Sequence, residues 1–378
     1  MGQAGWMRAF VCHQCHEQLV FFENTRCVHC QALLGFDPES RDVVALARQG
    51  DGTYRSVDVS GRGTATGDRR YRFCANEVLA VCNWLVPADA GSTPTLCVSC
   101  RLTRTRPNDH DLEGLAAFAD AEAAKRQLLF QLLDLGLPVV SRWEDPEHGL
   151  AFDLLTDERD SVVIGHHHGV ITLNLAESDD AYRERTRRQL GEAYRTLLGH
   201  FRHEIGHYYW DVLVNRTSNL EAFRALFGDE RNDYHSSIER HYDAGPAADW
   251  ETQFVSAYAT MHPWEDWAET FAHYLHIRDT LQTAAEFGLM LIGPKDGEGR
   301  RMHDLSATPQ DGGYRADRFD RVIDEWLPLT YALNAINRSM GKGDLYPFVL
   351  PPAVIRKLSF IHDLVVRADG SNRLEATG

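Results

Sequence analysis

The sequence lacks the features that would direct a protein into a membrane or out of the cell. Its 378 residues contain no apolar run near the ~20 residues that a membrane helix needs. The first residues, from Met1 to Trp6, show no basic stretch followed by an apolar one, so no secretion signal is apparent. A positive charge excess is also missing: the formal net charge is -16, which disfavours nucleic acid as a partner. We therefore expect a cytoplasmic protein that has no membrane partner.

Cysteine is missing from the chain after Cys100, and all eight cysteines lie between Cys12 and Cys100. In a reducing compartment, close cysteine pairs favour metal over disulfides. The first set forms two C-x2-C pairs, which are turns that aim two thiolates at one ion; its members are Cys12, Cys15, Cys27 and Cys30. The second set is Cys74, Cys82, Cys97 and Cys100, with one C-x2-C pair. We predict two structural zinc sites. Rubredoxin-like iron is the alternative for the first set, and two ordinary buried thiols, Cys74 and Cys82, for the second.

A single stretch carries the clearest chemistry. It has the pattern H-E-x-x-H, with His203, Glu204 and His207. A helix turns ~100° per residue, so the two histidines project from one face and can share one zinc ion. Glu204 lies at the flank of that face, where it can deprotonate a water on the zinc. The alternative is the polar face of an ordinary helix, which the apolar neighbours disfavour because they predict burial. Gly206 indicates close packing between the histidines.

A third zinc ligand is expected from a helix that begins near Pro263. Glu265 and Glu269 are four residues apart and share one face of it. One can bind zinc while the other accepts the free N–H of a ligand histidine. Two acids on a solvated face are the alternative. His262 and His273 are competing ligands, which we rank lower because the pair of acids explains more.

The chain divides by pattern into three segments: a zinc-ribbon region over 1–110, a connecting helix over 111–138, and a peptidase domain over 139–378. Apolar residues at helical spacing predict the helix over 112–135. The clearest strand is 170–175, which is rich in β-branched residues. The expected fold class is α+β, a mainly helical zincin-like domain with a small β-sheet, preceded by small zinc ribbons.

These motifs resemble those of gluzincins, metallopeptidases that add a glutamate from a second helix to H-E-x-x-H. The resemblance implies that Glu265 binds zinc and that Glu269 orients a histidine. Tyr258, seven residues before Glu265, matches a tyrosine that stabilises the tetrahedral intermediate in the lethal-factor and Mlc-titration-factor branches. The whole chain is similar to the bacterial "putative zinc-binding metallopeptidase" family; the matching stretches are 74–87, 97–106, 170–177, 197–211 and 262–275.

Zincin architecture also suggests where a substrate would lie. An edge strand ahead of the active helix binds extended peptide by backbone pairing. The candidate strand here supplies Val170, Thr172 and Asn174.

We therefore expect a zinc peptidase with one catalytic and two structural zinc ions, acting on a peptide or protein substrate. A first rival is a binding module, in which the ribbons hold a protein partner or nucleic acid and the zincin fold is a non-catalytic scaffold. A second rival is a protease recruited to DNA by its ribbons. Its local support is a basic cluster of Arg101, Arg104 and Arg106.

Overall fold

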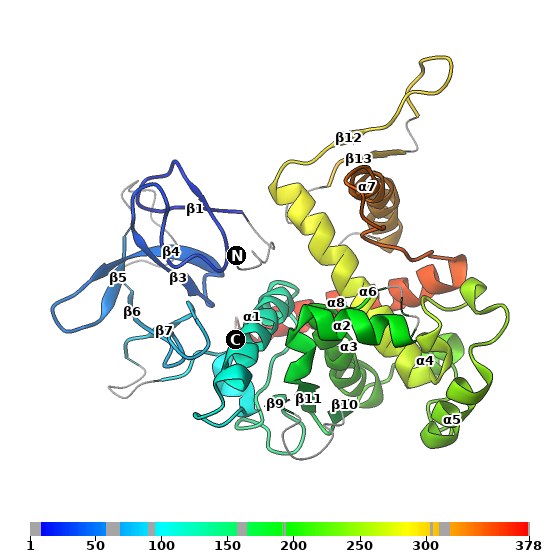
Figure 1. Ribbon diagram of the computed structural model, residues 1–378, viewed down its shortest axis with the longest axis horizontal. Helices are drawn as coiled ribbons and strands as arrows, with labels where there is room; N and C mark the ends of the chain where they lie inside the picture. Colours follow the sequence, from blue (N-terminus) through cyan, green and yellow to red (C-terminus); the bar gives the residue numbers. More distant parts are fainter. Residues whose placement is uncertain are drawn as a thin grey trace. The chain divides into compact units, whose positions relative to one another are not determined.

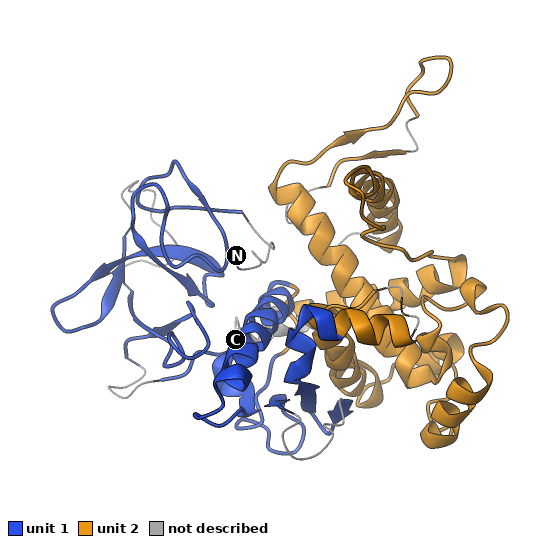
Figure 2. Ribbon diagram, viewed as in Figure 1, with its two compact units in different colours: residues 1–134, 139–182 blue, residues 135–138, 183–378 orange. Residues whose placement is uncertain are grey.

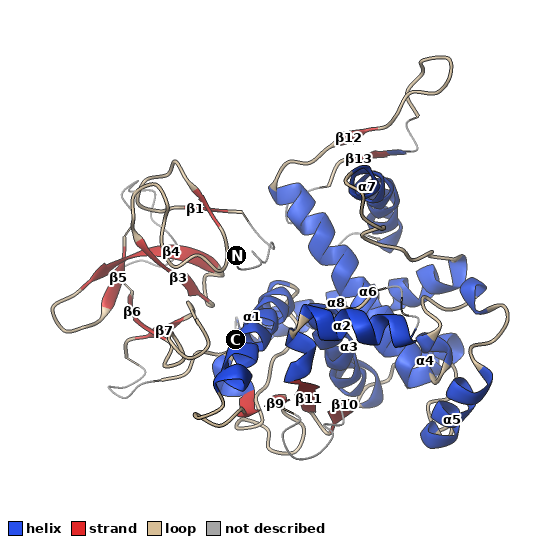
Figure 3. Ribbon diagram, in the orientation of Figure 1, coloured by secondary structure: helices blue, strands red, loops and turns tan. Residues whose placement is uncertain are grey.

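The computed structural model describes residues 9–57, 69–89, 95–156, 165–190, 192, 194–302, 305–309 and 318–376. The chain forms two compact units (Figure 2): unit 1 comprises 1–134 and 139–182, and unit 2 comprises 135–138 and 183–378. Strands gather in unit 1 and helices in unit 2 (Figure 3). The α+β class predicted from the sequence is confirmed.

Unit 1 begins with short strands that carry the cysteines between them. β1 (Phe10–Val11) pairs with β2 (Leu19–Val20). A five-stranded antiparallel sheet follows, in chain order: β3 (Leu33–Asp37), β4 (Asp42–Arg48), β5 (Tyr54–Ser56), β6 (Arg70–Phe73) and β7 (Leu85–Pro87). Its core contains Val44, Leu46, Tyr71 and Leu85. Alternation of buried and exposed positions is weak, because β3 and β4 are buried on both faces.

The first long helix, α1 (Leu112–Asp134), belongs to this packed unit, where the sequence indicated a connecting arm. Its Phe130 ring lies 5.2 Å from the Phe22 ring and 5.5 Å from the Phe36 ring, between centroids. Trp84 completes the cluster, with its ring 4.8 Å from Phe36. These aromatic side chains are all buried. Burying four large rings in one cluster stabilises the docking of α1 by several kcal/mol, at roughly 1.5–3 kcal/mol per side chain.

A four-stranded sheet has the order β10-β11-β9-β8. Its strands are β8 (Thr103–Thr105), which follows the short helix η1 (Cys100–Leu102), then β9 (Ala151–Leu155), β10 (Gly165–His167) and β11 (Val170–Asn174). β11 pairs with β10 on one side and with β9 on the other. The expectation of an edge strand is therefore wrong at Val170 and Thr172, because both backbone edges are paired there; Asn174 pairs with β9 alone among the described strands.

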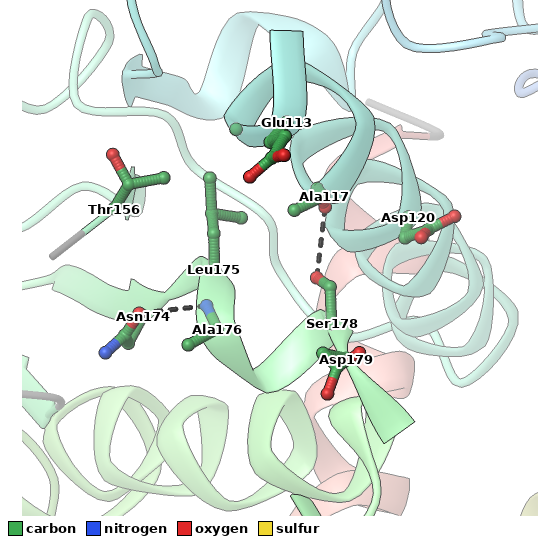
Figure 4. A pocket seen from close by; sticks show the side chains of 10 residues that line it. Glu113, Ala117, Asp120, Thr156, Asn174, Leu175, Ala176, Ser178 and Asp179 are labelled. Carbon is green, nitrogen blue, oxygen red and sulfur yellow. Dashed lines mark hydrogen bonds between the residues drawn. The ribbon is translucent and has the colours of Figure 1, made fainter. Parts of the chain in front are cut away.

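Asn174 has a local task at the end of β11. Its side-chain oxygen accepts a hydrogen bond from the backbone N–H of Ala176 at 2.9 Å and so caps η2 (Leu175–Ser178). Ser178 in turn donates to the Ala117 carbonyl of α1 at 3.0 Å. Figure 4 shows both bonds in the wall of a hollow of about 380 Å³ in unit 1. The hollow carries three carboxylates, from Glu113, Asp120 and Asp179.

Unit 2 is built from helices (Figure 1). In chain order they are α2 (Asp180–Leu190), which begins in unit 1, α3 (Leu197–Trp210), the π-helix η3 (Asp211–Asn215), α4 (Leu220–Phe227), α5 (Tyr234–Ala244), η4 (Trp250–Thr252), η5 (Tyr258–Thr260), α6 (Pro263–Glu286), α7 (Phe319–Ser339) and α8 (Pro352–Ala376). β12 (Leu291–Ile292) and β13 (Ser306–Ala307) form a hairpin ahead of α7. No helix among the described residues has the length and apolar character needed to cross a membrane.

The contact between α3 and α6 is what positions the candidate site. A Cβ atom at Gly206 of α3 would lie 3.0 Å from the Ala268 Cα of α6, so only glycine fits there without a shift. Trp267 of α6 donates its ring N–H to the Gly206 carbonyl at 2.8 Å. The close packing predicted at Gly206 is confirmed. It brings the two helix faces that carry the histidines and the glutamates against each other.

Candidate metal centres and active site

The first cysteine set lies in two turns of unit 1. Its sulfur atoms face one another: Cys12 and Cys30 are 3.7 Å apart, and Cys15 and Cys27 are 3.8 Å apart. Zinc with tetrahedral Zn–S bonds of about 2.3 Å has sulfur–sulfur edges of about 3.8 Å, whereas a disulfide bond is about 2.05 Å long. The spacing therefore fits a four-thiolate metal site. Cys12 and Cys27 are buried, while Cys15 and Cys30 are partly exposed.

The second cysteine set also comes together, and all four of its residues are buried. The sulfurs of Cys82 and Cys97 are 3.7 Å apart, which again matches a zinc tetrahedron. Backbone N–H groups of Asn76 and Cys97 donate to the Cys74 sulfur at 3.5 and 3.3 Å. Such bonds stabilise a thiolate. Cys74 and Cys82, whose wide spacing left ordinary core residues as an alternative, thus lie within one cluster of possible ligands.

Buried charges on α1 adjoin this second cluster. Glu122 accepts from the Cys100 thiol at 3.5 Å and from the Lys125 ammonium at 2.5 Å, and both charged side chains are fully buried. The guanidinium of Arg126 donates to the Ala80 carbonyl at 3.2 Å, in the turn before Cys82. Lys125 is paired with Glu122, and Arg126 lies 3.6 Å from Glu23, so the charges of these four side chains balance one another. Sequence patterns did not reveal these residues, because α1 carries other charged side chains, including Glu113, Asp120 and Asp134, and charged residues on a helix are mostly exposed.

In unit 2 the structure brings His203, His207 and Glu265 together, with one donor atom of each within 4.8 Å of the others. Nε2 of His203 is 3.0 Å from Glu265 Oε2, and Nε2 of His207 is 3.4 Å from Glu265 Oε1. Ligand atoms of a tetrahedral zinc with bonds of about 2.0–2.1 Å lie about 3.3 Å apart. Of the two acids that the sequence offered, Glu265 is thus the one placed beside both imidazoles.

The electrostatics of this cluster favour a cation. Burial lowers the pKa of His203, but hydrogen bonds that the ring donates to Glu265 and Glu269 outweigh burial and raise that pKa well above its usual value. The buried carboxylate of Glu265 and the partly buried one of Glu269 therefore hold positive charge at this point. The donor set of two imidazoles and one carboxylate is also one that zinc accepts. Both observations indicate that the residues fit a zinc ion.

Glu269 occupies the place expected for a partner of a ligand histidine. It accepts from Nδ1 of His203 at 2.8 Å, which leaves Nε2 as the nitrogen available to an ion. Its other oxygen accepts from the Ser256 hydroxyl at 2.6 Å. Burial raises the Glu269 pKa, but these bonds outweigh burial and lower it, so the carboxylate stays ionised. Ser256 was missed in the sequence because a loop serine has no motif spacing to mark it.

The competing histidines have other partners. His262 caps α6: its Nδ1 accepts from the Trp264 N–H at 3.1 Å, and its Nε2 donates to the Asn232 carbonyl at 3.0 Å. His273 pairs through Nδ1 with the Tyr346 hydroxyl at 2.7 Å, and burial lowers its pKa to about 4. Neither belongs to the cluster of donor atoms around His203.

Two further groups complete the surroundings of the cluster. Glu204 is 8% exposed, and its Oε2 is buried with no hydrogen-bond partner among the described residues. Burial raises its pKa. Such an oxygen calls for a partner that protein atoms do not supply. The Tyr258 ring, from η5, lies 5.9 Å from the His203 ring, and burial raises the pKa of its hydroxyl, which therefore remains a donor.

A second tyrosine, Tyr234 at the start of α5, was not anticipated. Its hydroxyl donates to Glu265 Oε1 at 2.8 Å. It lies 31 residues before Glu265 in the chain, on a different helix, so no local spacing connects the two.

The basic cluster next to the second cysteine set is largely neutralised. Arg104 forms a two-pronged ion pair with Asp153, and Arg106 lies 2.7 Å from Asp109. These pairs occupy two of the three arginines on which recruitment to DNA depended.

Comparison with known proteins agrees with the donor clusters. Residues 114–364 match the model of a family described as "Putative zinc-binding metallo-peptidase", and residues 9–111 match that of a zinc-ribbon domain. The chain therefore belongs to this metallopeptidase family, and the resemblance stated from its motifs is confirmed. The uncharacterized proteins Rv2568c of Mycobacterium tuberculosis and Mb2598c of Mycobacterium bovis are each 48% identical over 360 residues, 95% of both chains. No solved structure matches.

Proposed function

We propose that the protein is a zinc-dependent peptidase that hydrolyses peptide bonds in a peptide or protein substrate. The observation that carries the proposal is the cluster of His203, His207 and Glu265, the last two of them buried, with a Glu204 oxygen on the same helix that has no partner among the described residues. Three protein donors leave a coordination position open, as catalytic zinc sites do, whereas four cysteines close it. One catalytic and two structural ions follow from this count.

The chain's own residues would divide the work as follows. A zinc ion held by His203, His207 and Glu265 would supply Lewis-acid chemistry. Glu204 would take the proton of the attacking water and pass it to the leaving amine. Its raised pKa makes the carboxylate a stronger base than an exposed glutamate. The Tyr258 hydroxyl would donate to the developing oxyanion, a contribution commonly worth ~2.7–4 kcal/mol.

Glu269 and Ser256 would not contact the zinc ion but would hold one of its ligands, His203, in place. By accepting from Nδ1 of His203, Glu269 holds the ring in one orientation and one tautomer. Ser256 holds Glu269 in turn. We also place the protein in a reducing cytoplasm, because both cysteine sets are arranged as thiol clusters for metal. The ribbon region could bind a protein partner there without taking part in the chemistry.

The decisive test is Glu204→Gln, which keeps the shape of the side chain and removes the base. Zinc content should stay the same, and turnover of an unstructured peptide library should fall about 10²–10⁴-fold, the usual contribution of a general base. Glu221→Gln is the matched control, because Glu221 lies on α4 with a side chain 92% exposed. Turnover equal to wild type in Glu204→Gln would sink the assigned mechanism.

The metal assignment has its own measurement. Protein purified without a polyhistidine tag should contain about three zinc ions per chain, as two closed sites and one open site require. His203→Ala combined with His207→Ala should remove one ion and leave those of the cysteine sets. If this double variant lost no zinc, the α3 site would not bind metal and the binding-module hypothesis would replace the peptidase.

A further inference from the structure

The carboxylate of Glu265 has a third contact besides the two histidines. Its Oε1 accepts the Tyr234 hydroxyl at 2.8 Å, and its Oε2 lies 3.0 Å from His203 Nε2. Glu265 itself is 2% exposed, so water does not compete for these oxygens. The phenol therefore restricts the rotation of a buried carboxylate whose two oxygens each face one imidazole, because Oε1 also lies 3.4 Å from His207 Nε2.

Tyr234 is held in place from the N-terminal end of α6. Its ring lies 5.2 Å from the His262 ring and 6.3 Å from the Trp264 ring, between centroids. His262 also donates to the carbonyl of Asn232, two residues before Tyr234. The N-cap residue of α6, His262, thus holds the backbone two residues before Tyr234, and the Tyr234 hydroxyl contacts Glu265 of the same helix. His262, which the sequence offered as a competing zinc ligand, uses both ring nitrogens to hold the backbone.

The helix that begins at Tyr234 has few other anchors. Of the residues in α5, only Ser237 is buried. Its first turn is capped by Asp233, which accepts from the Ser236 N–H at 2.7 Å. The hydrogen bond to Glu265 is therefore a principal link between this exposed helix and the buried site.

We propose that Tyr234 is a positioning residue for the zinc ligand Glu265, whose carboxylate it holds in the orientation that faces His203 and His207. The inference rests on the proposed function and extends it. It separates the two tyrosines of the site: Tyr258 would act on the substrate oxyanion, whereas Tyr234 acts on the affinity of the site for metal. Outer partners of metal ligands typically account for 10–100-fold in metal affinity.

The test is zinc affinity, measured on the full chain by competition with a chromogenic chelator. The His203→Ala, His207→Ala double variant identifies which zinc ion belongs to the central site. Tyr234→Phe should weaken binding of that ion about 10–100-fold and leave the cysteine-bound ions unchanged. Tyr258→Phe should keep the wild-type zinc affinity and lower kcat. Tyr242→Phe is the matched control, because it removes a hydroxyl group from the same helix, α5, at a residue that is 65% exposed.

The outcomes separate the two proposals. Zinc affinity of Tyr234→Phe equal to that of wild type would overturn the positioning role, even if hydrolysis fell, while leaving the peptidase intact. A wild-type chain that binds zinc only at its cysteines would overturn the peptidase and the positioning role together. Phenylalanine retains the ring contacts, and the near-ultraviolet circular dichroism of the variant with zinc at its cysteines should match that of wild type in the same state. A changed spectrum together with lower zinc affinity would show that Tyr234 stabilises the fold, and this result would overturn the proposal.

Discussion

The cysteine clusters of unit 1 and the histidine–glutamate cluster of unit 2 are all candidate metal sites, but they differ in the number and kind of their donor atoms. Each cysteine cluster supplies four thiols and closes a tetrahedron. The α3–α6 cluster supplies three donors, and its partners are 62 residues apart in the chain, so a helix–helix contact has to bring them together. The number of protein donors separates a closed site from one that leaves a coordination position open. The comparison also shows that the open site depends on helix packing, whereas each cysteine cluster contains at least one pair that a local turn brings together.

The two cysteine clusters differ from each other as well. Two of the four thiols are partly exposed in the first cluster, and none is in the second. The second cluster adjoins buried Glu122 and Lys125 of α1, which have no solvent to replace a lost partner. Disturbing it should therefore expose uncompensated buried charges as well as release zinc.

The largest effect is expected from Cys97→Ser in the buried cluster. Structural zinc sites contribute apparent binding free energies of ~10–16 kcal/mol to folding, so unit 1 should lose its cooperative fold. Cys15→Ser, at a partly exposed thiol of the first cluster, should weaken zinc binding but leave the α1 core protected. Zinc stoichiometry with limited proteolysis of both variants measures this. Equal protease resistance in the two would show that the clusters contribute alike.

The sequence predicted most donor atoms and few of their neighbours. Motif spacing reflects local geometry, so H-E-x-x-H, the C-x2-C pairs and the Glu265–Glu269 interval all led to residues that the structure brings together. Tyr234 and Ser256 reach the site only through tertiary packing, and nothing in their spacing shows it. The edge position was wrong for a related reason: β-branched residues predict a strand, but the neighbours of β11 are set by the order of the sheet.

Unit 2 also contains a buried imidazole, His273, whose titration makes stability depend on pH. His273 in unit 2 has its pKa lowered to about 4 by burial, against a usual value near 6.5. Between these values the unfolded chain takes up a proton that the folded chain refuses, so stability falls as the pH falls. The loss approaches ~1.4 kcal/mol per pH unit, or about 2 kcal/mol between pH 6.5 and 5.

His273→Gln removes this titration. Its unfolding free energy in urea should decrease between pH 7 and 5 by about 2 kcal/mol less than that of wild type. His235→Gln is the control, because that side chain is 82% exposed on α5. The same pH dependence in wild type and His273→Gln would mean that His273 is protonated within the fold, and that the acid response arises elsewhere.

The smallest effect tests whether the open site depends on helix packing as the comparison requires. Gly206→Ala places a methyl group 3.0 Å from the Ala268 Cα and 3.1 Å from its carbonyl oxygen, both backbone atoms that cannot rotate away. Overpacking costs about 1–3 kcal/mol, and the gain in helix propensity returns about 1 kcal/mol, so the net destabilisation should be on the order of 1 kcal/mol. Gly343→Ala is the control, because its Cβ would meet nothing within 4 Å.

A shift of α6 against α3 moves Glu265 relative to the histidines, so zinc affinity should fall at the central site and stay constant at the cysteines. Unchanged zinc affinity in a destabilised Gly206→Ala chain would show that His203, His207 and Glu265 tolerate movement of the helices. The central site and the cysteine sites would then differ only in the number of their donors.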